Sequence, residues 1–440
     1  MSVYQAVRTP TDMPISGWYG ILPPPKAPEV LRGRHKADWI IVGAGFAGLA
    51  AARRLSQLVP NERIVVVDAQ RVGWGAAGRN SGFMIDLPHE LGGEHYGGSQ
   101  DHDRRRIRMN RAAIEFSGSA AEEYGLQPYF VRAGKVHGAA TDHGLKSLRD
   151  FESHLAGLDE PFSRLDSADM KRITGTDFFM GGTFTPGTVM AQPAGFIRGL
   201  AAGLSGRVEI FENSPVTTLR TGREHKIHTA EGEIVAPRLI LTVNGHLESF
   251  GFFQHRLLHV FTYASMTRAL STKEQTKLGG EPHWGVIPGD PMGSTIRRIG
   301  DRIVVRNTFT YNPNMATSDR QVRKIGHAHD QSFKARFPML GDVAMDYRWG
   351  GHLCLSLNSA PAFGEVEDRV YVAGCCNGLG TVQGTLYGML TAELALGSGE
   401  PMVADALSEP QPVRLYPGPV MAVAAPIRLW LMQKRAGREL

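Results

Sequence analysis

The stretch from Trp39 to Gly48 constrains the fold of this chain more than any other. It reads Trp-Ile-Ile-Val-Gly-Ala-Gly-Phe-Ala-Gly, an apolar run that ends in three glycines, and the alanine-rich segment 49–58 follows it. The pattern predicts a strand, a tight turn and a helix. Gly43 would permit the sharp turn, Gly45 would leave room for a pyrophosphate, and Gly48 would let the helix pack closely on the strand. Backbone N–H groups and the positive end of the helix dipole would then face the phosphate oxygens.

A second strand and an acidic residue follow at the spacing that a bound dinucleotide requires. The apolar run Ile64–Val67 ends at Asp68, which lies 20 residues after Gly48. A carboxylate at about this distance can accept hydrogen bonds from an adenosine ribose. A lone glycine triplet also occurs in ordinary turns, but strand, triplet, helix, strand and acid in register favour dinucleotide binding. An enzyme that uses NAD alone would leave the later glycine clusters unexplained.

A glycine-rich stretch, 72–84, comes shortly after this unit. Its glycines surround Arg79 and Asn80. Such a stretch lets the backbone approach a flat or phosphorylated ligand, and the two side chains offer hydrogen-bond donors. The alternative is an ordinary surface loop, but the position after a dinucleotide fingerprint favours a ligand contact.

These motifs together resemble the FAD-dependent amine and D-amino acid oxidase superfamily, and within it the γ-glutamylputrescine oxidase branch. That branch commonly carries Gly-Ala-Ser-Gly-Arg-Asn-Gly-Gly where this chain reads Gly75-Ala-Ala-Gly-Arg-Asn-Ser-Gly. Ala77 replaces the serine and Ser81 replaces one glycine. Both residues are small, so close approach to a ligand is kept while one hydroxyl group moves.

A second likeness to this branch begins at Trp349. The chain carries Trp-Gly-Gly and then Asn-Ser-Ala-Pro-Ala-Phe-Gly, and from Val370 an apolar run breaks into a glycine-rich turn before a helix that starts at about Thr381. In the family this helix N-terminus points at the flavin pyrimidine and stabilises negative charge on the reduced ring. The alternative is a second ordinary strand-to-helix turn.

Some family members attach FAD through a cysteine thioether near the position of Cys354. The matching branch generally binds FAD without a covalent bond, so the resemblance favours a buried, small hydrophobic role for this cysteine. FAD is therefore expected to be non-covalent, with a link through Cys354 as the less favoured alternative.

The resemblance implies an α/β fold in which a Rossmann-like FAD-binding domain is interleaved with a mainly antiparallel β-sheet substrate domain. It divides the chain into an extended N-terminal arm (1–36), a discontinuous FAD-binding domain (37–100, 190–245 and 350–400), a substrate-binding domain (101–189 and 246–349) and a C-terminal tail with a short helix (401–440).

The resemblance also assigns residues to the cofactor. They are the glycine motifs, the acid after the second strand and their neighbours: Gly43, Ala44, Gly45, Phe46, Ala47, Gly48, Asp68, Ala69, Gly75, Ala76, Ala77, Arg79, Asn80, Ser81, Gly82, Val216, Asn244, Gly245, Gly374, Asn377, Gly378, Leu379, Gly380 and Thr381.

No catalytic acid or base is assigned, because the family rarely needs one. The substrate-pocket candidates are Phe83, Met84, His259, Tyr263, Arg306, Trp349 and His352, with Arg297 and Tyr311 as further polar residues of the β-rich segment. Relatives often carry glycine near Arg306, and a guanidinium there would hold a substrate carboxylate with two hydrogen bonds. The alternative is an exposed strand residue.

Composition excludes several other classes. A net charge of +5 is modest for 440 residues, and no concentrated basic stripe indicates nucleic acid. The three cysteines have neither a disulfide framework nor zinc spacing, so no metal site is predicted and a reducing compartment is favoured. No signal peptide and no apolar run of about 18 residues appear, which predicts a cytoplasmic protein without a spanning helix. The oligomeric state is left open.

The segment 426–437 combines apolar residues with Lys434 and Arg435. Two interpretations remain: it rests on a membrane surface, or it packs on its own domain, which is the simpler account.

The predicted function is FAD-dependent oxidation of the C–N bond of a secondary amine, a γ-glutamyl amine or a D-amino acid. The resemblance implies hydride transfer to flavin N5, an imine that hydrolyses, and oxygen or another acceptor for the electrons. The alternatives are a flavin-dependent hydroxylase that uses a nicotinamide cofactor and a non-catalytic FAD-binding protein. The sequence names neither the amine nor the electron acceptor.

Overall fold

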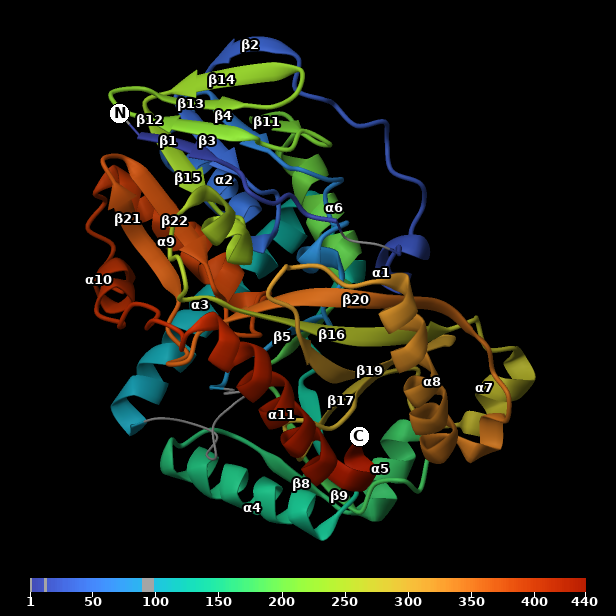
Figure 1. Ribbon diagram of the computed structural model, residues 1–440. Helices are drawn as coiled ribbons and strands as arrows, with labels where there is room; N and C mark the ends of the chain where they lie inside the picture. Colours follow the sequence, from blue (N-terminus) through green and yellow to red (C-terminus); the bar gives the residue numbers. More distant parts are fainter. Residues whose placement is uncertain (1, 12–13, 89–98) are drawn as a thin grey trace.

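The computed structural model describes residues 2–11, 14–88 and 99–440, and its strands form four sheets (Figure 1). The predicted segment 37–100 therefore includes ten residues, 89–98, that lie outside the described part. The α-helices are α1 Gly17–Gly20, α2 Phe46–Leu58, α3 Gln100–Tyr124, α4 Asp142–Gly157, α5 Ser167–Thr174, α6 Pro193–Leu204, α7 Thr272–Leu278, α8 Asp319–Arg336, α9 Val382–Leu396, α10 Pro401–Leu407 and α11 Gly418–Ala436.

A six-stranded sheet carries the fingerprint. Its order is β11–β4–β3–β15–β22–β21; β21 pairs antiparallel with β22, and the other pairings are parallel. The strands are β3 Trp39–Val42, β4 Ile64–Val67, β11 Val208–Phe211, β15 Arg238–Leu241, β21 Ala362–Glu367 and β22 Val370–Gly374.

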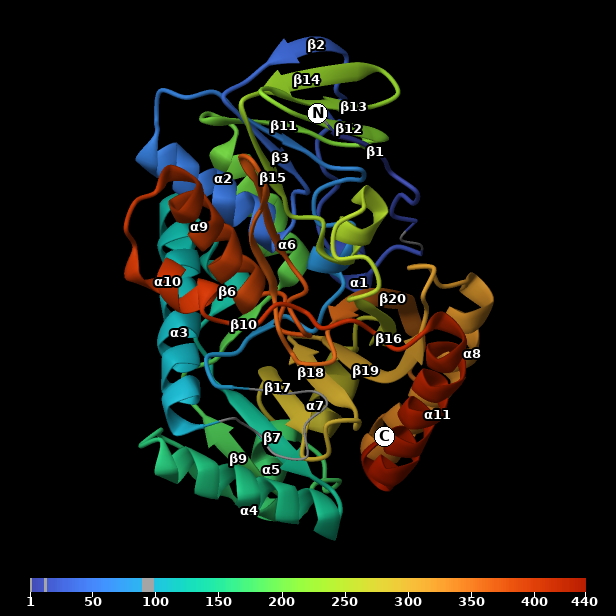
Figure 2. The same cartoon turned by 60° about the vertical axis from the view of Figure 1, so that its left-hand side comes forward.

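Both faces of this sheet are buried. In β3, Trp39 and Ile41 pack in one core with residues of α2, α6 and α9, whereas Ile40 and Val42 pack in a second core with the five-stranded sheet. Figure 2 shows α2, α3 and α9 gathered on one side. A parallel strand covered on both faces reads as a continuous apolar run, which explains the sequence before Gly43.

The five-stranded sheet has the order β1–β12–β13–β14–β2, and a three-stranded sheet has the order β5–β10–β6. The predicted N-terminal arm, 1–36, supplies the two edge strands of the former, and Trp18 of α1 is fully buried. The strands are β1 Ser2–Gln5, β2 Gly33–Lys36, β5 Phe83–Met84, β6 Phe130–Val131, β10 Val189–Ala191, β12 Thr218–Thr221, β13 His225–His228 and β14 Gly232–Ala236.

The eight-stranded sheet has the order β20–β16–β19–β18–β17–β7–β9–β8 and is antiparallel except between β17 and β7. Apolar residues of one face form a core with α5, α7 and α8. The strands are β7 Lys135–Ala139, β8 Ser163–Leu165, β9 Gly181–Thr185, β16 Leu258–Thr267, β17 His283–Pro288, β18 Thr295–Ile299, β19 Arg302–Tyr311 and β20 Met345–Leu355. The predicted fold class, a Rossmann-like unit with a mainly antiparallel sheet, is confirmed.

Two details differ from the sequence-based expectation. The expected short helix of 401–440 is replaced by α10 and the 19-residue α11, with Pro426 inside the latter. β20 crosses the predicted domain boundary at 350 and lies wholly in the eight-stranded sheet. The domain boundaries therefore stay a prediction.

The contact between α2 and α9 yields a stability prediction. A Cβ at Gly388 would lie 2.1 Å from the carbonyl oxygen of Ala47. Gly388→Ala should therefore lower the free energy of unfolding by about 1–3 kcal/mol, because the helices must separate. Urea unfolding measures the loss.

Gly206→Ala is the matched control, because a Cβ there meets nothing within 4 Å. It should be neutral or slightly stabilising. Equal stability of the two variants would contradict the close packing of α2 and α9.

Candidate functional site

The turn after β3 has the geometry that its three glycines predict. Gly43 has a φ of 106°, and a Cβ at Gly48 would lie 1.8 Å from the Gly43 carbonyl oxygen. A Cβ at Gly45 would meet only the Ala77 Cβ, at 3.7 Å, so this position is open. Gly45 is also the N-cap of α2 and gives the helix no side-chain cap. The first N–H groups of α2 therefore end at an open space.

Asp68 closes this turn from the end of β4. Its Oδ2 accepts a hydrogen bond from the Ala44 N–H at 2.7 Å, and its Oδ1 accepts one from the Gln70 N–H at 2.8 Å. The carboxylate is thus fixed beside the glycine turn.

A cavity of about 230 Å³ lies at the carboxyl ends of these strands. We call it the glycine-rich cavity. Most of the predicted cofactor residues line it, namely Gly43, Ala44, Gly45, Phe46, Ala47, Asp68, Ala69, Gly75, Ala76, Ala77, Asn80, Val216, Asn244, Gly374, Gly378 and Gly380. Parallel strands explain this convergence, because their carboxyl ends meet at one edge of the sheet.

A second cavity, of about 100 Å³, continues from the first, and we call it the arginine cavity. Six residues line both spaces: Ala76, Asn80, His352, Leu353, Gly378 and Gly380. The predicted residues that line only the second are Arg79, Ser81, Gly82, Phe83, Arg306, Leu379 and Thr381. The N-terminus of α9 reaches this cavity too, since its N-cap Thr381 lines the cavity and makes no capping hydrogen bond.

Strand register decides which side chains of the eight-stranded sheet face the arginine cavity. Thr295 pairs with Arg306, and both line the cavity. The next pair, Ile296 with Val305, points to the opposite face and lies in the core with α8. This alternation follows from the pleat of the sheet.

Arg306 presents a guanidinium without an acceptor. Its Cζ lies 4.8 Å from the centre of the Phe309 ring, and no hydrogen bond or ion pair of this side chain occurs within the described residues. Burial lowers the pKa of Arg306 to about 10, so the group stays positive at neutral pH. By contrast, Arg79 donates to the carbonyl oxygens of Trp74 and Gly350, at 2.7 and 3.1 Å.

A row of buried polar groups stands behind His352. Its Nε2 lies 3.2 Å from His259 Nδ1, and His259 Nε2 lies 2.9 Å from Glu248 Oε2. Burial, with the nearby His259 and His246 imidazoles, holds the pKa of His352 well below its usual value. Burial likewise lowers the pKa of His246 to about 4. The imidazoles of His352 and His246 are therefore neutral at pH 7.

The cysteines near the glycine-rich cavity are poor nucleophiles. The hydrogen bond with Cys375 and burial raise the pKa of the Cys354 thiol well above its usual value. Burial raises the pKa of Cys376 to about 12. A thiol is reactive as a thiolate, so neither group is activated here.

Several predicted residues do not line these two cavities. Met84 and Trp349 are buried in the core, and Trp349 Nε1 donates to the Arg79 carbonyl oxygen at 3.0 Å. Tyr263 lies on the far face of β16, where its hydroxyl contacts Thr310 Oγ1 at 2.7 Å. His259 lines neither cavity and contacts His352, which lines both. Gly48 and Gly245 pack inside the fold, and Tyr311 lines neither cavity.

Asn377 is used within the loop after β22. Its Oδ1 accepts from the Ser356 N–H at 2.8 Å, and its Nδ2 donates to the carbonyl oxygens of Cys375 and Ala360 at 3.0 and 3.1 Å. It lines a third space of about 930 Å³ between α3, α11 and β16, which we call the α11 cavity. The sequence motif placed Asn377 at the cofactor, whereas its side chain stabilises the turn.

Arg297 holds the turn before β5 and does not face the cavity. Its Nη1 donates to the carbonyl oxygens of Ser81 and Ala191, at 3.0 and 2.7 Å. Its guanidinium lies between the rings of Trp18 and Phe83, 5.2 and 5.4 Å from their centres. Burial lowers the pKa of Arg297 to about 9.

Sequence reasoning missed lining residues that come from distant segments. The glycine-rich cavity includes the N-terminal residues Arg8–Thr11, as well as His246 and Met315. Arg8 is fixed there by a hydrogen bond from Nη1 to the Pro313 carbonyl oxygen, 2.7 Å away. No local pattern marks these residues, since only the tertiary fold brings them to the cavity.

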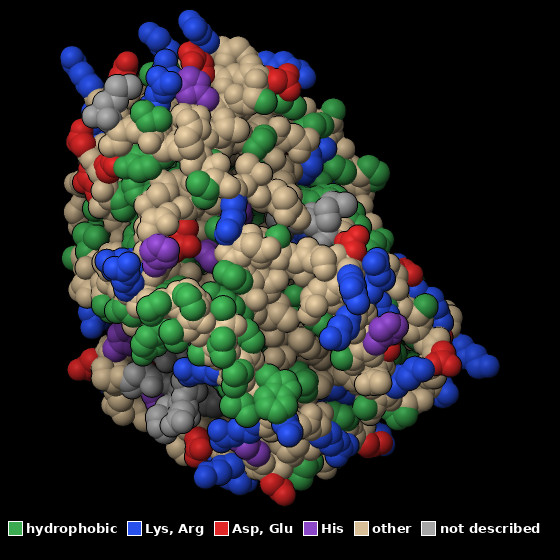
Figure 3. Space-filling model, in the orientation of Figure 1, with side chains coloured by type: hydrophobic (Ala, Val, Ile, Leu, Met, Phe, Trp, Pro, Cys, Tyr) green, Lys and Arg blue, Asp and Glu red, His purple; other side chains and the backbone are tan. Residues whose placement is uncertain are grey.

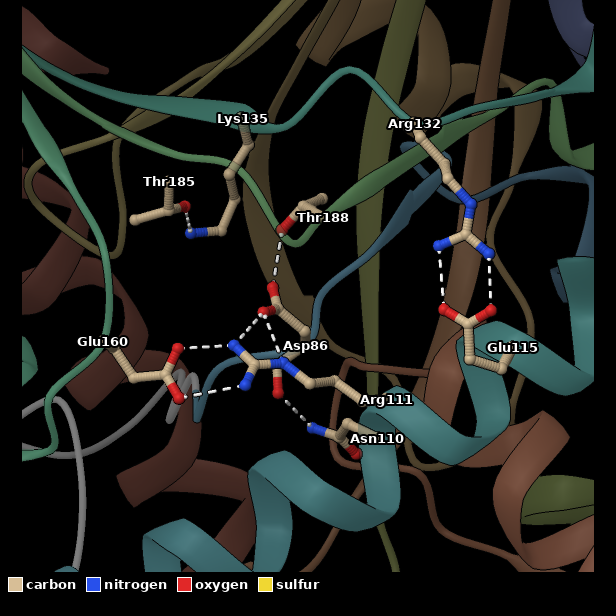
Figure 4. Close-up of polar contacts among 9 residues, drawn as sticks. All are labelled: Asp86, Asn110, Arg111, Glu115, Arg132, Lys135, Glu160, Thr185 and Thr188. Atoms are coloured by element: carbon tan, nitrogen blue, oxygen red, sulfur yellow. Dashed lines mark hydrogen bonds and ion pairs between the residues drawn. The ribbon is translucent and has the colours of Figure 1, made fainter.

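A separate polar network joins β5 to α3 (Figure 4). Asp86 is fully buried; its Oδ2 lies 3.1 Å from Arg111 Nη2, and its Oδ1 accepts from Thr188 Oγ1 at 3.3 Å. Nearby, the buried Lys135 donates to Thr185 Oγ1 at 3.0 Å, and burial lowers the pKa of Lys135 to about 8. These contacts fix the segment that leads into the arginine cavity.

The described residues contain neither a candidate metal site nor a candidate membrane-spanning helix. Within residues 2–11, 14–88 and 99–440, no cluster of three or more His, Cys, Asp or Glu side chains could hold a metal ion. In the same ranges no helix has the length and apolar character needed to cross a bilayer.

Comparison with known proteins identifies a family. A model described as DAO, FAD dependent oxidoreductase, matches residues 38–394. The γ-glutamylputrescine oxidoreductase of Escherichia coli is 24% identical over 386 residues, 84% of this chain and 86% of that protein. Sarcosine oxidase subunit beta of Rhizobium meliloti is 25% identical over 362 residues, 78% and 80% of the two chains. In fold, the glycine oxidase of Geobacillus kaustophilus matches with a TM-score of 0.67 at 19% identity, over 82% of this chain and 95% of that one.

The depressed pKa of His246 yields a pH prediction. In the unfolded chain the His246 imidazole has a pKa near 6.5, whereas in the folded protein it has a pKa of about 4. Between these two pH values the unfolded state binds a proton that the folded state does not. The free energy of unfolding should therefore fall as the pH falls from 6.5 to 4, with a contribution approaching about 1.4 kcal/mol per pH unit from this residue. Urea unfolding at several pH values should show a shallower slope for His246→Gln.

Ser249→Ala is the control, because Ser249 Oγ is only the hydrogen-bond partner of His246 Nδ1, at 3.2 Å. It should keep most of the slope. Parallel profiles for the parent protein and His246→Gln would contradict the assignment.

Proposed function

Because this chain belongs to the DAO family of FAD-dependent oxidoreductases, we propose that it oxidises the C–N bond of an amine or amino acid that carries a carboxylate. The observation that carries the proposal is the Arg306 guanidinium in the arginine cavity, which has no acceptor among the described residues. The family membership confirms the resemblance predicted from the glycine motifs; the substrate class is our inference.

The residues of the glycine-rich cavity fit the cofactor that the family uses. Gly45 is open on the cavity side, so a pyrophosphate can approach the backbone there. The uncapped N-termini of α2 and α9 would supply N–H groups and positive potential at the phosphates and at the flavin ring. Asp68 would bind the ribose, and Val216 would lie beside the adenine.

We infer that FAD is held without a covalent bond. Cys354 lines the glycine-rich cavity, but its raised pKa leaves little thiolate to form a thioether. The proposal thus keeps the cysteine as a small apolar residue of the cavity wall.

When bound, FAD supplies a two-electron acceptor for the hydride equivalent lost from the carbon next to the substrate nitrogen. The substrate must reach this point as a neutral amine, because an ammonium group has no lone pair to stabilise the developing positive charge. The resulting imine is then hydrolysed by water to a carbonyl compound and an amine or ammonia.

The charges of the arginine cavity favour that neutral amine. Within the described residues, its lining contains the guanidinium groups of Arg79 and Arg306, the neutral His352 and no carboxylate. The positive potential attracts a substrate carboxylate and opposes an ammonium group, so it lowers the pKa of the amine. Glu248, the nearest carboxylate of the histidine row, lies behind two imidazoles. The cavity therefore orients the anion and favours the neutral form of the reacting nitrogen, whose proton passes to water.

The test of the function is an anaerobic titration of the flavin absorbance. The purified protein, reconstituted with FAD, is mixed with secondary amines, γ-glutamyl amines and D-amino acids, each with and without a carboxylate. We expect bleaching with at least one carboxylate-bearing amine. Bleaching by NADPH alone would favour a hydroxylase, and no bleaching with any compound would favour a binding protein; either outcome contradicts the proposal.

The role of Arg306 is tested by Arg306→Met. Loss of a charged hydrogen-bond partner costs about 1.5–3 kcal/mol, so the KM of the carboxylate substrate should rise about 10–100-fold. The analogue without a carboxylate should be unaffected. Arg306→Lys should recover part of the loss.

Arg302→Met is the matched control on the same strand, because Arg302 bonds Thr267 and Asp346 outside the cavity. Equal losses for the carboxylate and carboxylate-free substrates in Arg306→Met would show that Arg306 acts on the fold and not on the anion.

A further inference from the structure

Helix α11 is apolar on two opposite sides. Its inner side packs on the body through Met421, Leu429, Met432 and Ala436, which line the α11 cavity or pack beside β16 and β19. Its outer side repeats apolar residues at 420, 423, 427, 430 and 431. This spacing places them on one stripe of the helix surface.

The outer stripe is exposed to solvent. Val423 is 62% exposed, Trp430 58% and Ile427 52%. Figure 3 shows hydrophobic side chains gathered on the face where Figure 1 draws α11. Monomeric proteins rarely leave such a contiguous apolar surface open to water unless it contacts something.

The charges that α11 itself carries all have one sign. Arg428, Lys434 and Arg435 belong to α11, and the sequence from 418 to 438 contains no acidic residue. The Lys434 ammonium lies 5.2 Å from the centre of the Trp430 ring, so a positive charge adjoins this exposed indole. Long basic side chains can keep their charged ends in a headgroup layer while their stems lie along apolar surface.

The helix is held firmly in place. Gln433 Nε2 donates to the Phe309 carbonyl oxygen at 3.1 Å, and its Oε1 accepts from the Phe309 N–H at 3.0 Å. Just after α11, the buried Glu439 carboxylate accepts from the backbone N–H groups of Ala140 and Asp290 at 2.9 and 2.8 Å. These bonds fix which side of α11 faces outward.

We propose that the outer stripe of α11 docks this protein on the surface of an anionic phospholipid bilayer. Apolar groups of an interfacial helix enter the boundary between headgroups and acyl chains, while basic groups pair with anionic headgroups. Trp430 and Ile427 lie in that boundary layer, and Arg428, Lys434 and Arg435 contact the headgroups. The helix lies flat and does not span the bilayer.

Charge distinguishes this partner from a second copy of the chain. Two identical stripes facing each other would bring the Lys and Arg side chains of both helices together without an acidic residue of α11 to offset them. A like-charged interface of this kind is unfavourable. An anionic lipid layer offsets the same charges.

The test is sedimentation of the FAD-loaded protein with lipid vesicles, which needs no substrate and is independent of the proposed reaction. We expect binding to phosphatidylcholine vesicles that contain ~30% phosphatidylglycerol as the anionic lipid. Binding to vesicles of phosphatidylcholine alone should be at least about tenfold weaker. Ile427→Ser with Trp430→Ser should reduce binding about tenfold or more.

Two control variants distinguish binding through the outer stripe from non-specific binding to lipid. Leu407→Ser removes an exposed apolar residue of α10, and Lys273→Gln with Lys277→Gln removes two charges of α7. Both should keep full binding, whereas Arg428→Gln with Lys434→Gln should weaken it. Unchanged melting temperature and flavin content show that each variant is folded.

Equal binding to neutral vesicles, or no binding to anionic ones, would overturn the proposal. So would a concentration-dependent dimer, detected by light scattering, that Ile427→Ser with Trp430→Ser abolishes while vesicle binding is absent. That last result would assign the stripe to a second copy.

Discussion

The parallel alignment of β3, β4, β15 and β22 is the constraint on which the remaining architecture depends. Each of these strands ends at the same edge of the six-stranded sheet, so the turns after them converge. The contacts there are close: the Asn244 Oδ1 accepts from the Cys375 N–H at 3.0 Å, and Thr242 Oγ1 donates to the Gly43 carbonyl oxygen at 2.9 Å. One edge of one sheet thus builds most of the glycine-rich cavity, and distant segments such as Arg8–Thr11 and β20 complete its lining.

The eight-stranded sheet contributes side chains to the cavities, whereas the six-stranded sheet contributes mainly backbone groups. Its alternation places Thr295 and Arg306 toward the arginine cavity and puts Val305 into the core. Arg297 ties the two halves together, because it bonds the carbonyl oxygens before β5 and at the end of β10. In the proposed function, backbone groups of the six-stranded sheet and the helix termini beside it bind the cofactor. A few charged side chains of the eight-stranded sheet select the substrate.

The local motifs were predictable and the tertiary contacts were not. The role of Gly43 and Gly48 follows from steric limits over six residues, so the sequence alone specified the turn and the family it belongs to. The direction of Tyr263 depends on strand pairing and on a bulge beside Thr262, which no residue pattern marks. Asn377 shows a different limit, since a motif identifies a polar side chain but not whether a loop or a ligand uses it. Arg8 lies at the cavity through contacts with residues about 300 positions away. The sequence predicted only a short helix in 401–440, because no local pattern reveals the hydrogen bonds between Gln433 and Phe309 that hold the 19-residue α11 in place.

The great sequence separation between β3 and β22 has a consequence for biosynthesis. The glycine motif after β3 leaves the ribosome early. Its sheet lacks β22, the strand that pairs with β15, until residues 370–374 have been made. Until then β15 has an unpaired edge beside apolar surface, a state that is prone to aggregation and slow to resolve. Folding of this half is therefore expected to be largely post-translational. A chain that ends before residue 370 would also lack Gly374, Gly378 and Gly380 of the cavity lining.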